Sequence, residues 1–194
     1  MKEKTRCPWG AANEWCMPYH DTEWGTPNHD DLVHFEFLVL EAAQAGLSWL
    51  TILKRREGYR AAYRGFDPAR VARFTERDVE RLLGDPGIIR NRLKIRSSIE
   101  NARLFLALQE ERGSFDDYLW SWVDGKPVVN AWTKESQVPP RTALSDAISK
   151  DLVKRGFTFV GSTIVYSHLQ AVGIVNDHLV SCFRHAEVRR RRRS

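Results

Sequence analysis

The chain has 194 residues, of which 42% are apolar, 30 are Lys or Arg and 25 are Asp or Glu. A chain of this length can bury one sizeable core without disulfide bonds, and its three cysteines are too few for a secreted disulfide scaffold. No apolar run is long enough to cross a membrane, and no apolar signal core follows the first residues, Met-Lys-Glu-Lys. We therefore expect a cytoplasmic protein that does not insert into membranes.

The net charge of +5 is concentrated at the end of the chain. Arg189 to Arg193 are five consecutive arginines, and removing them leaves 25 basic residues against 25 acidic ones. We expect a single domain over residues 1–188 and a disordered arginine-rich tail at 189–194. Such a tail can add nonspecific affinity for phosphates, or it can simply be a solvated end.

Helical signals dominate the chain from residue 30 onward. Asp30 and Asp31 can cap a helix with apolar residues at helical spacing that runs toward Gly46. Caps, glycine stops and apolar periodicity predict further helices around residues 49–53, 68–74, 76–83, 91–111, 114–123, 142–155, 162–173 and 176–182. No run alternates apolar and polar residues for more than a few positions, so the predicted fold class is all-α.

Two residues near the C-terminus have the spacing of a metal-binding pair. His178 and Cys182 are four positions apart, which places both on one face if the segment is helical. The N-terminal segment offers the other half of a tetrahedral zinc site: Cys7, Cys16 and His20. Spacing does not choose between the two cysteines, and Pro18 argues against a helix around His20. The alternative is that these residues are unrelated and that Cys182 is simply buried.

Aromatic residues crowd the first 25 positions: Trp9, Trp15, Tyr19 and Trp24. They can line a pocket for a flat ligand, or they can form a lid over the core. Glu41 stands within an apolar stretch, and an unpaired buried carboxylate is costly. An aromatic cage with one carboxylate suits a flat cation that presents N–H donors. A position at a water-facing helix edge is the competing interpretation of Glu41.

Residues 82–91 join two predicted helices by a short turn that contains two glycines. This pattern resembles a helix-hairpin-helix, in which glycines let the backbone approach a phosphate and the second helix start binds it. Arg90, Arg92 and Lys94 lie beside the turn, and we interpret Lys94 as a phosphate contact. A hairpin with a purely structural role remains the alternative.

Together these features resemble one family, the bacterial 3-methyladenine DNA glycosylase I enzymes. The similarity runs from about Arg6 to Cys182, and it is carried by residues 6–9, 19–25, 40–49, 155–161 and 175–178. The resemblance implies a helix-hairpin-helix glycosylase fold whose N- and C-terminal segments are tied by one structural Zn²⁺ ion. The implied ligands of that ion are Cys7, His20, His178 and Cys182.

The resemblance also implies the residues of the base site. The base pocket would use Glu41 as the catalytic residue, with Tyr19, Trp49 and Trp9 binding the base. Gly46 and Leu47 would form the wedge that enters the DNA where the base has left. This chain departs from the family at Cys16, since members often carry an aromatic residue at or near that position.

The implied activity is excision of 3-methyladenine from alkylated double-stranded DNA by a monomer, with the free base as product and no strand-cleaving step. One rival is a noncatalytic zinc-stabilised helical module that binds DNA or a protein. A second rival, a bifunctional enzyme with an iron–sulfur cluster, would need four clustered cysteines, whereas the chain has three.

Overall fold

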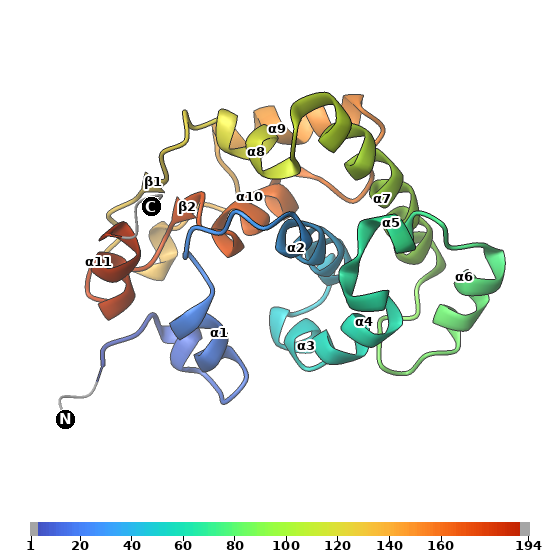
Figure 1. Cartoon of the computed structure of the whole chain (residues 1–194). Coiled ribbons are helices and arrows are strands. Elements are labelled where there is room, and N and C mark those ends of the chain that lie inside the picture. The colour runs from blue at the N-terminus through green and yellow to red at the C-terminus, as the bar shows by residue number, and fades with distance from the viewer. Residues whose placement is uncertain (1–3, 191–194) are drawn as a thin grey trace.

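The computed structural model describes residues 4–190 and is mostly helical, as the sequence predicts (Figure 1). The α-helices are α1 (Cys16–Thr22), α2 (Asp31–Gln44), α3 (Trp49–Leu53), α4 (Arg56–Ala62), α5 (Pro68–Val71), α6 (Glu76–Leu83), α7 (Arg92–Arg112), α8 (Phe115–Ser121), α9 (Ala143–Lys154), α10 (Ser162–Ala171) and α11 (Phe183–Arg190). Short 3-10 helices are η1 (Pro8–Ala11), η2 (Arg64–Phe66) and η3 (Glu135–Gln137). Two short strands, β1 (Val128–Val129) and β2 (Val175–Asn176), pair in parallel.

Helix α2 runs through the middle of the molecule (Figure 1). The Asp30 side chain accepts a hydrogen bond from Leu32 N and so caps its first turn. Residues 34–43 are all buried, because α3, α7, α8 and α10 pack around the helix. A polar side chain in the second half of α2 is therefore held away from bulk water, and this decides the environment of Glu41.

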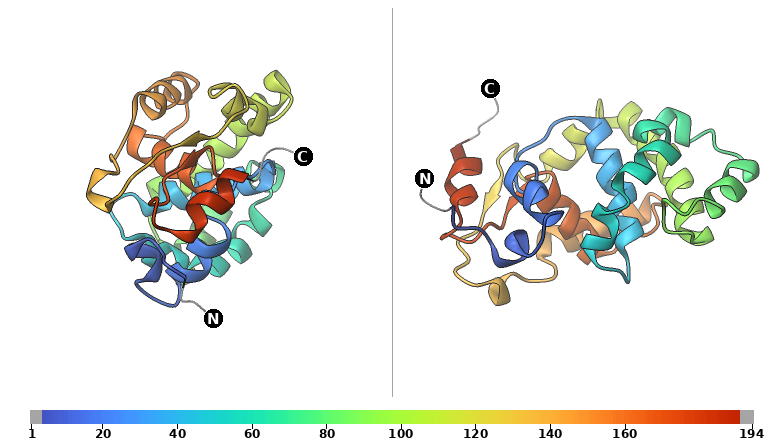
Figure 2. Two further views of the ribbon diagram at one scale, coloured as in Figure 1. Left: turned by 90° about the vertical axis from the view of Figure 1, so that its left-hand side faces the viewer. Right: turned by 90° about the horizontal axis from the view of Figure 1, so that it is seen from below.

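The two ends of the chain lie together at one end of the molecule. Both views of Figure 2 place α11 near the N-terminal segment, and Phe183 N donates a hydrogen bond to Thr5 O at 3.0 Å. The β1–β2 pair joins the same region to the middle of the chain, with Val128 opposite Val175. The opposite end is built from α4 to α7 (Figure 1).

Two predictions about the chain ends were wrong. Residues 177–182 are not helical but form a loop and turn between β2 and α11. The buried Asp177 holds this segment by accepting hydrogen bonds from several side chains, which local spacing does not reveal. Conversely, α1 forms in spite of Pro18, because a proline in the first turn removes an N–H that has no helical partner.

The predicted turn between α6 and α7 is present at residues 84–91, and α4 packs closely against it. A Cβ atom on Gly58 would lie 2.4 Å from Gly87 O, and the Tyr59 hydroxyl accepts a hydrogen bond from Ile89 N at 3.1 Å. Lys94, which we interpret from the sequence as a phosphate contact, is bound within the protein in this structure. Its Nζ donates to Ala43 O and Ala45 O at 2.8 and 2.6 Å, so it caps the C-terminal end of α2.

The predicted domain boundary at residue 188 falls inside α11, whose backbone continues to Arg190. The rest of the predicted tail, 191–194, lies outside the described residues. None of the helices found in residues 4–190 is long and apolar enough to cross a membrane.

Candidate functional site

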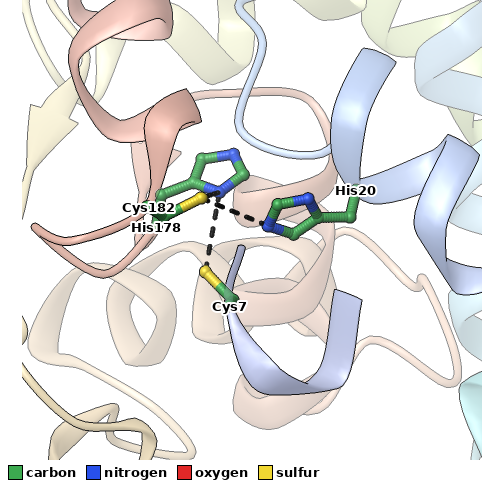
Figure 3. A group of neighbouring side chains, drawn as sticks. All are labelled: Cys7, His20, His178 and Cys182. Carbon is green, nitrogen blue, oxygen red and sulfur yellow. Dashed lines mark hydrogen bonds between the residues drawn. The ribbon is translucent and has the colours of Figure 1, made fainter. Parts of the chain in front are cut away.

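Four buried side chains from the two chain ends converge on one point (Figure 3). Cys7 precedes η1 and His20 lies on α1, while His178 and Cys182 come from the loop between β2 and α11. One potential ligand atom from each residue lies within 4.8 Å of the others. The structure therefore brings Cys7 into this Cys2His2 cluster, whereas Cys16 is not a member of it.

Three sulfur–nitrogen distances within the cluster match edges of a zinc tetrahedron. Cys182 Sγ lies 3.5 Å from His20 Nε2 and 3.6 Å from His178 Nδ1, and Cys7 Sγ lies 3.8 Å from His178 Nδ1. Tetrahedral Zn–S and Zn–N bonds of usual length put sulfur and nitrogen ligands about 3.6 Å apart. The donor set and its spacing thus fit a tetrahedral metal ion bound by two sulfurs and two imidazoles.

Both histidines are oriented by a second hydrogen bond. His20 Nδ1 lies 2.8 Å from Asp21 Oδ1, and the same carboxylate accepts hydrogen bonds from Arg6. His178 Nε2 lies 2.9 Å from Trp24 O. An N–H donated to each oxygen leaves the other ring nitrogen with a lone pair that faces the cluster, the arrangement expected of metal-binding histidines.

Two glycines make room for the histidine rings, and the sequence analysis did not identify them. A Cβ atom on Gly10 would lie 2.4 Å from ring atoms of His20. One on Gly25 would lie 3.0 Å from His178, and Gly25 has a φ of +74° that favours glycine. Larger residues at either position would displace a histidine of the cluster.

Beside the cluster lies a cavity of about 490 Å³ between α1, α2 and α10. Its lining is mainly aromatic and apolar but includes one carboxylate of α2, and it contains Trp9, Cys16, Tyr19, Trp24, Glu41, Gln44, Trp49 and Gln170. Cys7 and Leu179 border it as well, so the cluster forms part of the cavity wall. The predicted base-binding residues therefore share one cavity.

Glu41 is the unusual residue of this cavity, since only 3% of it is exposed. Its Oε2 atom has no hydrogen-bond partner among residues 4–190. Burial raises the pKa of the carboxyl to about 8, because the charged form loses its hydration. The interpretation of Glu41 as a water-facing residue at a helix edge is therefore wrong.

Aromatic rings surround this carboxyl group. The Tyr19 ring centroid lies 5.4 Å from that of Trp49 and 6.2 Å from that of Trp9. Burial, followed by the charge of Glu41, raises the pKa of Tyr19 well above its usual value, so its hydroxyl stays protonated. Trp49 Nε1 is also buried without a partner in the described part of the chain. The cavity thus combines aromatic rings with two residues that have unsatisfied polar atoms.

Asp177 is a buried residue of the site for which no role was predicted. It is 1% exposed and borders the cavity. Its carboxylate accepts hydrogen bonds from Asn130, Trp132, Tyr166 and Gln170. It therefore fixes the segment that carries His178 and one wall of the cavity at the same time. Its place directly before His178 was the available signal.

The proposed wedge residues lie in a tight turn after α2. Gly46 has a φ of +78°, and Leu47 is 41% exposed. The turn stands between Gln44 and Trp49, both of which border the cavity. Leu47 is therefore an exposed apolar side chain at the edge of the site. Trp15, the aromatic residue next to Cys16, is 46% exposed and is not among the residues that line the cavity.

The fold and these two sites define a small helical protein that carries a Cys2His2 cluster able to hold a metal ion and, beside it, an aromatic cavity with a buried carboxyl group. Comparison with known proteins narrows this class. Residues 9–185 match the family model described as methyladenine glycosylase, and the chain belongs to that family.

Relatives and solved structures agree with this assignment. The chain is 51% identical over 177 residues to DNA-3-methyladenine glycosylase 1 of Escherichia coli, covering 91% of this chain and 95% of that protein. A crystal structure of 3-methyladenine DNA glycosylase I is 50% identical with a TM-score of 0.88, covering 92% and 98%. The Staphylococcus aureus enzyme, in a structure described as showing the basis of 3-methyladenine recognition, is 38% identical with a TM-score of 0.88, covering 92% and 95%.

Proposed function

We propose that this protein is a monofunctional DNA glycosylase that hydrolyses the N-glycosidic bond of 3-methyladenine in alkylated DNA. Membership of the family and relatives that carry this activity in their names support the reaction class. The single observation that carries the proposal is the buried, unpartnered carboxyl group of Glu41 inside an aromatic cavity. A flat cationic base with N–H donors would satisfy it.

Methylation at N3 makes the adenine of a nucleotide cationic, so the base is already a good leaving group. In our proposal the nucleotide rotates out of the duplex and Leu47 fills the gap. Tyr19 and Trp49 hold the flat base, while Trp9 closes the cavity. Water then forms a bond to C1′ and gives up a proton to the solvent as the C1′–N9 bond breaks, and the electron pair of that bond neutralises the departing base.

Glu41 would select the base and stabilise it in the cavity. With a pKa of about 8, its carboxyl is largely protonated at neutral pH when the cavity holds no base. An incoming cation would lower that pKa, so the ion pair would form only with the charged lesion in place. Its oxygens would accept hydrogen bonds from the adenine edge, which differs from the edge of guanine. Orientation and binding then supply the remaining rate enhancement.

The metal-binding cluster would have a structural role. Cys7, His20, His178 and Cys182 would hold one Zn²⁺ ion, and such an ion would supply the bonds that tie the chain ends together. Four protein ligands complete a tetrahedral set, so the reacting water would come from elsewhere. The cluster also borders the cavity, so its integrity would keep Trp9 and Tyr19 in position.

We further assign residues 84–91 and the start of α7 to phosphate binding, as a helix-hairpin-helix. Arg90 is exposed beside this turn, whereas Arg92 forms ion pairs with Glu76 and Glu80 at 3.0 and 2.7 Å. The protein would act in the cytoplasm as a monomer on double-stranded DNA and release the free base.

The direct test is to incubate the purified protein with methylated genomic DNA and identify the released bases by chromatography. We expect release of 3-methyladenine, with 7-methylguanine left in the DNA. Glu41→Gln is the matched control: any base that this variant releases does not depend on the Glu41 carboxyl group. If a folded, metal-loaded sample releases no base, the noncatalytic binding module becomes the better description.

A further inference from the structure

A second, much smaller cavity lies directly behind Glu41. It is enclosed by α2, α8, α9 and α10, and apolar side chains form nearly all of its wall. Of the described residues that line it, two are polar: Glu41 from α2 and His168 from α10. Glu41 borders both cavities, so it separates the aromatic cavity from this inner chamber.

Both polar residues of the chamber have unsatisfied atoms. His168 is 5% exposed, and neither of its ring nitrogens has a hydrogen-bond partner within residues 4–190. Oε2 of Glu41 lacks a partner over the same part of the chain. Buried polar groups are nearly always paired with protein or ordered water. Because both residues border the same chamber, one partner within it would pair both groups.

The size of the chamber limits that partner to a single water molecule. The space within it for the centre of a water molecule is about 10 Å³. This is close to the minimum that one ordered water needs, and a buried water also needs two or more polar partners. A neutral imidazole offers one N–H donor and one lone pair, and a carboxylate offers acceptors. One water between the two residues would satisfy both.

We propose that a single buried water bridges the His168 ring to Oε2 of Glu41, and that His168 is thereby a positioning residue for Glu41. The neutral imidazole would donate a hydrogen bond to the water, and the water would donate one to the Glu41 carboxylate. This would favour the ionised form of Glu41 when a cationic base enters. The inference rests on the proposed function only in assigning Glu41 a role in base binding. The bridge itself is a property of the free protein.

The surroundings keep the His168 ring neutral and fixed. Burial, followed by the nearby His34, lowers the pKa of His168 to about 3. The His34 ring lies parallel to it, with centroids 5.8 Å apart. His34 Nε2 is held in turn by Asp116 Oδ1 at 3.1 Å, and His29 Nδ1 lies 3.0 Å from the same carboxylate. This layer sets the orientation of the ring behind Glu41.

Several other titratable groups surround Glu41 and enter the interpretation of its titration. Tyr19 approaches from α1, and Glu135 and Asp177 border the aromatic cavity. Asp116 of α8 lies behind His34. Of these groups, Asp116 is linked to His168 through the stacked His34 ring, and His168→Phe keeps a ring for that contact. A shift in the Glu41 titration that follows this substitution is therefore assigned to the bridge.

The test measures the titration of Glu41 in the free protein. The carboxyl-carbon NMR signals of protein labelled with ¹³C-glutamate are followed against pH, and the signal missing from Glu41→Gln is that of Glu41. In His168→Phe, which removes both ring nitrogens, we expect the midpoint to rise by about one pH unit, a tenfold change in the proton affinity. His168→Gln keeps a donor and should stay within about 0.3 unit of the wild type.

Ile164→Val is the matched control, since it trims the same chamber wall without removing a polar group. Its midpoint should equal that of the wild type. An unmoved midpoint in His168→Phe overturns the proposal. A high-resolution crystal structure gives an independent result, because an empty chamber in the wild type also overturns it. Neither experiment uses DNA, so a failure of base excision would count against the proposed function alone.

Discussion

The molecule has two buried polar regions side by side, and they are built in opposite ways. In the Cys2His2 cluster every ring nitrogen that faces away from the centre has an oxygen partner, such as Asp21 for His20. In the aromatic cavity, Trp49 keeps an indole N–H without a partner in the described chain, and the buried carboxyl group of Glu41 has no ion-pair partner there. The first region would be complete within the protein once a metal is bound, whereas in our proposal the second is completed by the base.

The difference has an energetic meaning. A buried polar atom without a partner costs about 1 to 3 kcal/mol, more when charged, so the cavity lowers the stability of the free protein. The cluster, by joining the two chain ends, offsets this cost when a metal binds. We therefore expect substitutions in the two regions to change stability in opposite directions, although both should reduce base excision.

The largest effect is expected from Cys7→Ser. It removes one ligand sulfur and leaves three buried donors without a complete metal site. We expect loss of bound zinc and a loss of stability of about 5 kcal/mol or more, or a melting temperature lower by about 10 to 20 °C. Zinc content by atomic absorption and thermal unfolding by circular dichroism measure both quantities.

Cys16→Ser is the matched control for that experiment. Cys16 is also a buried cysteine of the N-terminal segment, but it lines the cavity and lies outside the cluster. Its zinc content should equal that of the wild type. Unchanged zinc and melting temperature in Cys7→Ser, or a loss of zinc in Cys16→Ser, would show that the assignment of the ligands is wrong.

Glu41→Gln should have the opposite effect on stability. In the wild type, the folded protein keeps a proton on Glu41 up to about pH 8, whereas the unfolded chain releases it near 4.5. The folded state thus binds more protons in this window, so wild-type stability falls as the pH rises from 4.5 to 8. The glutamine variant lacks this loss and should be more stable by on the order of 3 kcal/mol at pH 8.

The same variant should excise 3-methyladenine about a hundredfold more slowly, because it lacks the charge that pairs with the cationic base. Denaturant unfolding at pH 5 and at pH 8, together with an excision assay, separates the two effects. A variant that is less stable than the wild type at pH 8, or that excises at full rate, would contradict the contrast between the two regions.

Trp49→Phe tests the second unsatisfied group of the cavity. It removes the buried indole N–H that lacks a partner but keeps an aromatic ring. We expect a change in unfolding free energy within about 1 kcal/mol and about a tenfold loss of excision, from reduced stacking on the base. Trp120→Phe is the control, because Trp120 Nε1 donates to Asn28 O at 3.4 Å and lies outside the cavity lining.

In contrast to Trp49→Phe, the Trp120 variant should lose stability and keep its excision rate. If Trp49→Phe and Trp120→Phe lower the free energy of unfolding equally, a hydrogen-bond partner for the indole N–H makes no difference to stability, and the contrast between the two regions does not hold.

Local signals predicted much of the fold. The cap at Asp30 begins α2, and the helices predicted over residues 68–74 and 76–83 begin at Pro68 and Glu76. The burial of Glu41 was also foreseeable, since the residues around it are apolar on every face of α2. Each of these features depends on neighbours within a few positions.

The features that failed depend on distant contacts. The helix expected at residues 176–182 is replaced by a loop, because Asp177 accepts hydrogen bonds from residues as far away as Asn130. Periodicity did reveal that His178 and Cys182 could form a pair, although the helix invoked for it does not exist. The chamber behind Glu41 could not be predicted, because His168 approaches it from a separate helix.

The smallest effect is expected where the cavity meets the proposed DNA surface, at Lys94. Its ammonium group is bound to Ala43 O and Ala45 O, directly before the turn that carries Leu47. Burial lowers its pKa, as expected for a charge that faces protein rather than a phosphate. Lys94→Met should therefore loosen this turn and slow excision about threefold, an effect of about 0.6 kcal/mol on the barrier.

Arg90→Met is the comparison that makes this prediction sharp, since Arg90 is exposed beside the turn at residues 84–91. The logarithm of the DNA-binding constant is plotted against the logarithm of the salt concentration. The slope of this plot should be smaller in magnitude by about one in Arg90→Met, because one phosphate contact is removed. The slope should be unchanged in Lys94→Met. A lower slope in the lysine variant would show that Lys94 leaves its carbonyl partners to bind a phosphate when DNA arrives, so that the edge of the cavity, like its interior, is completed by the ligand.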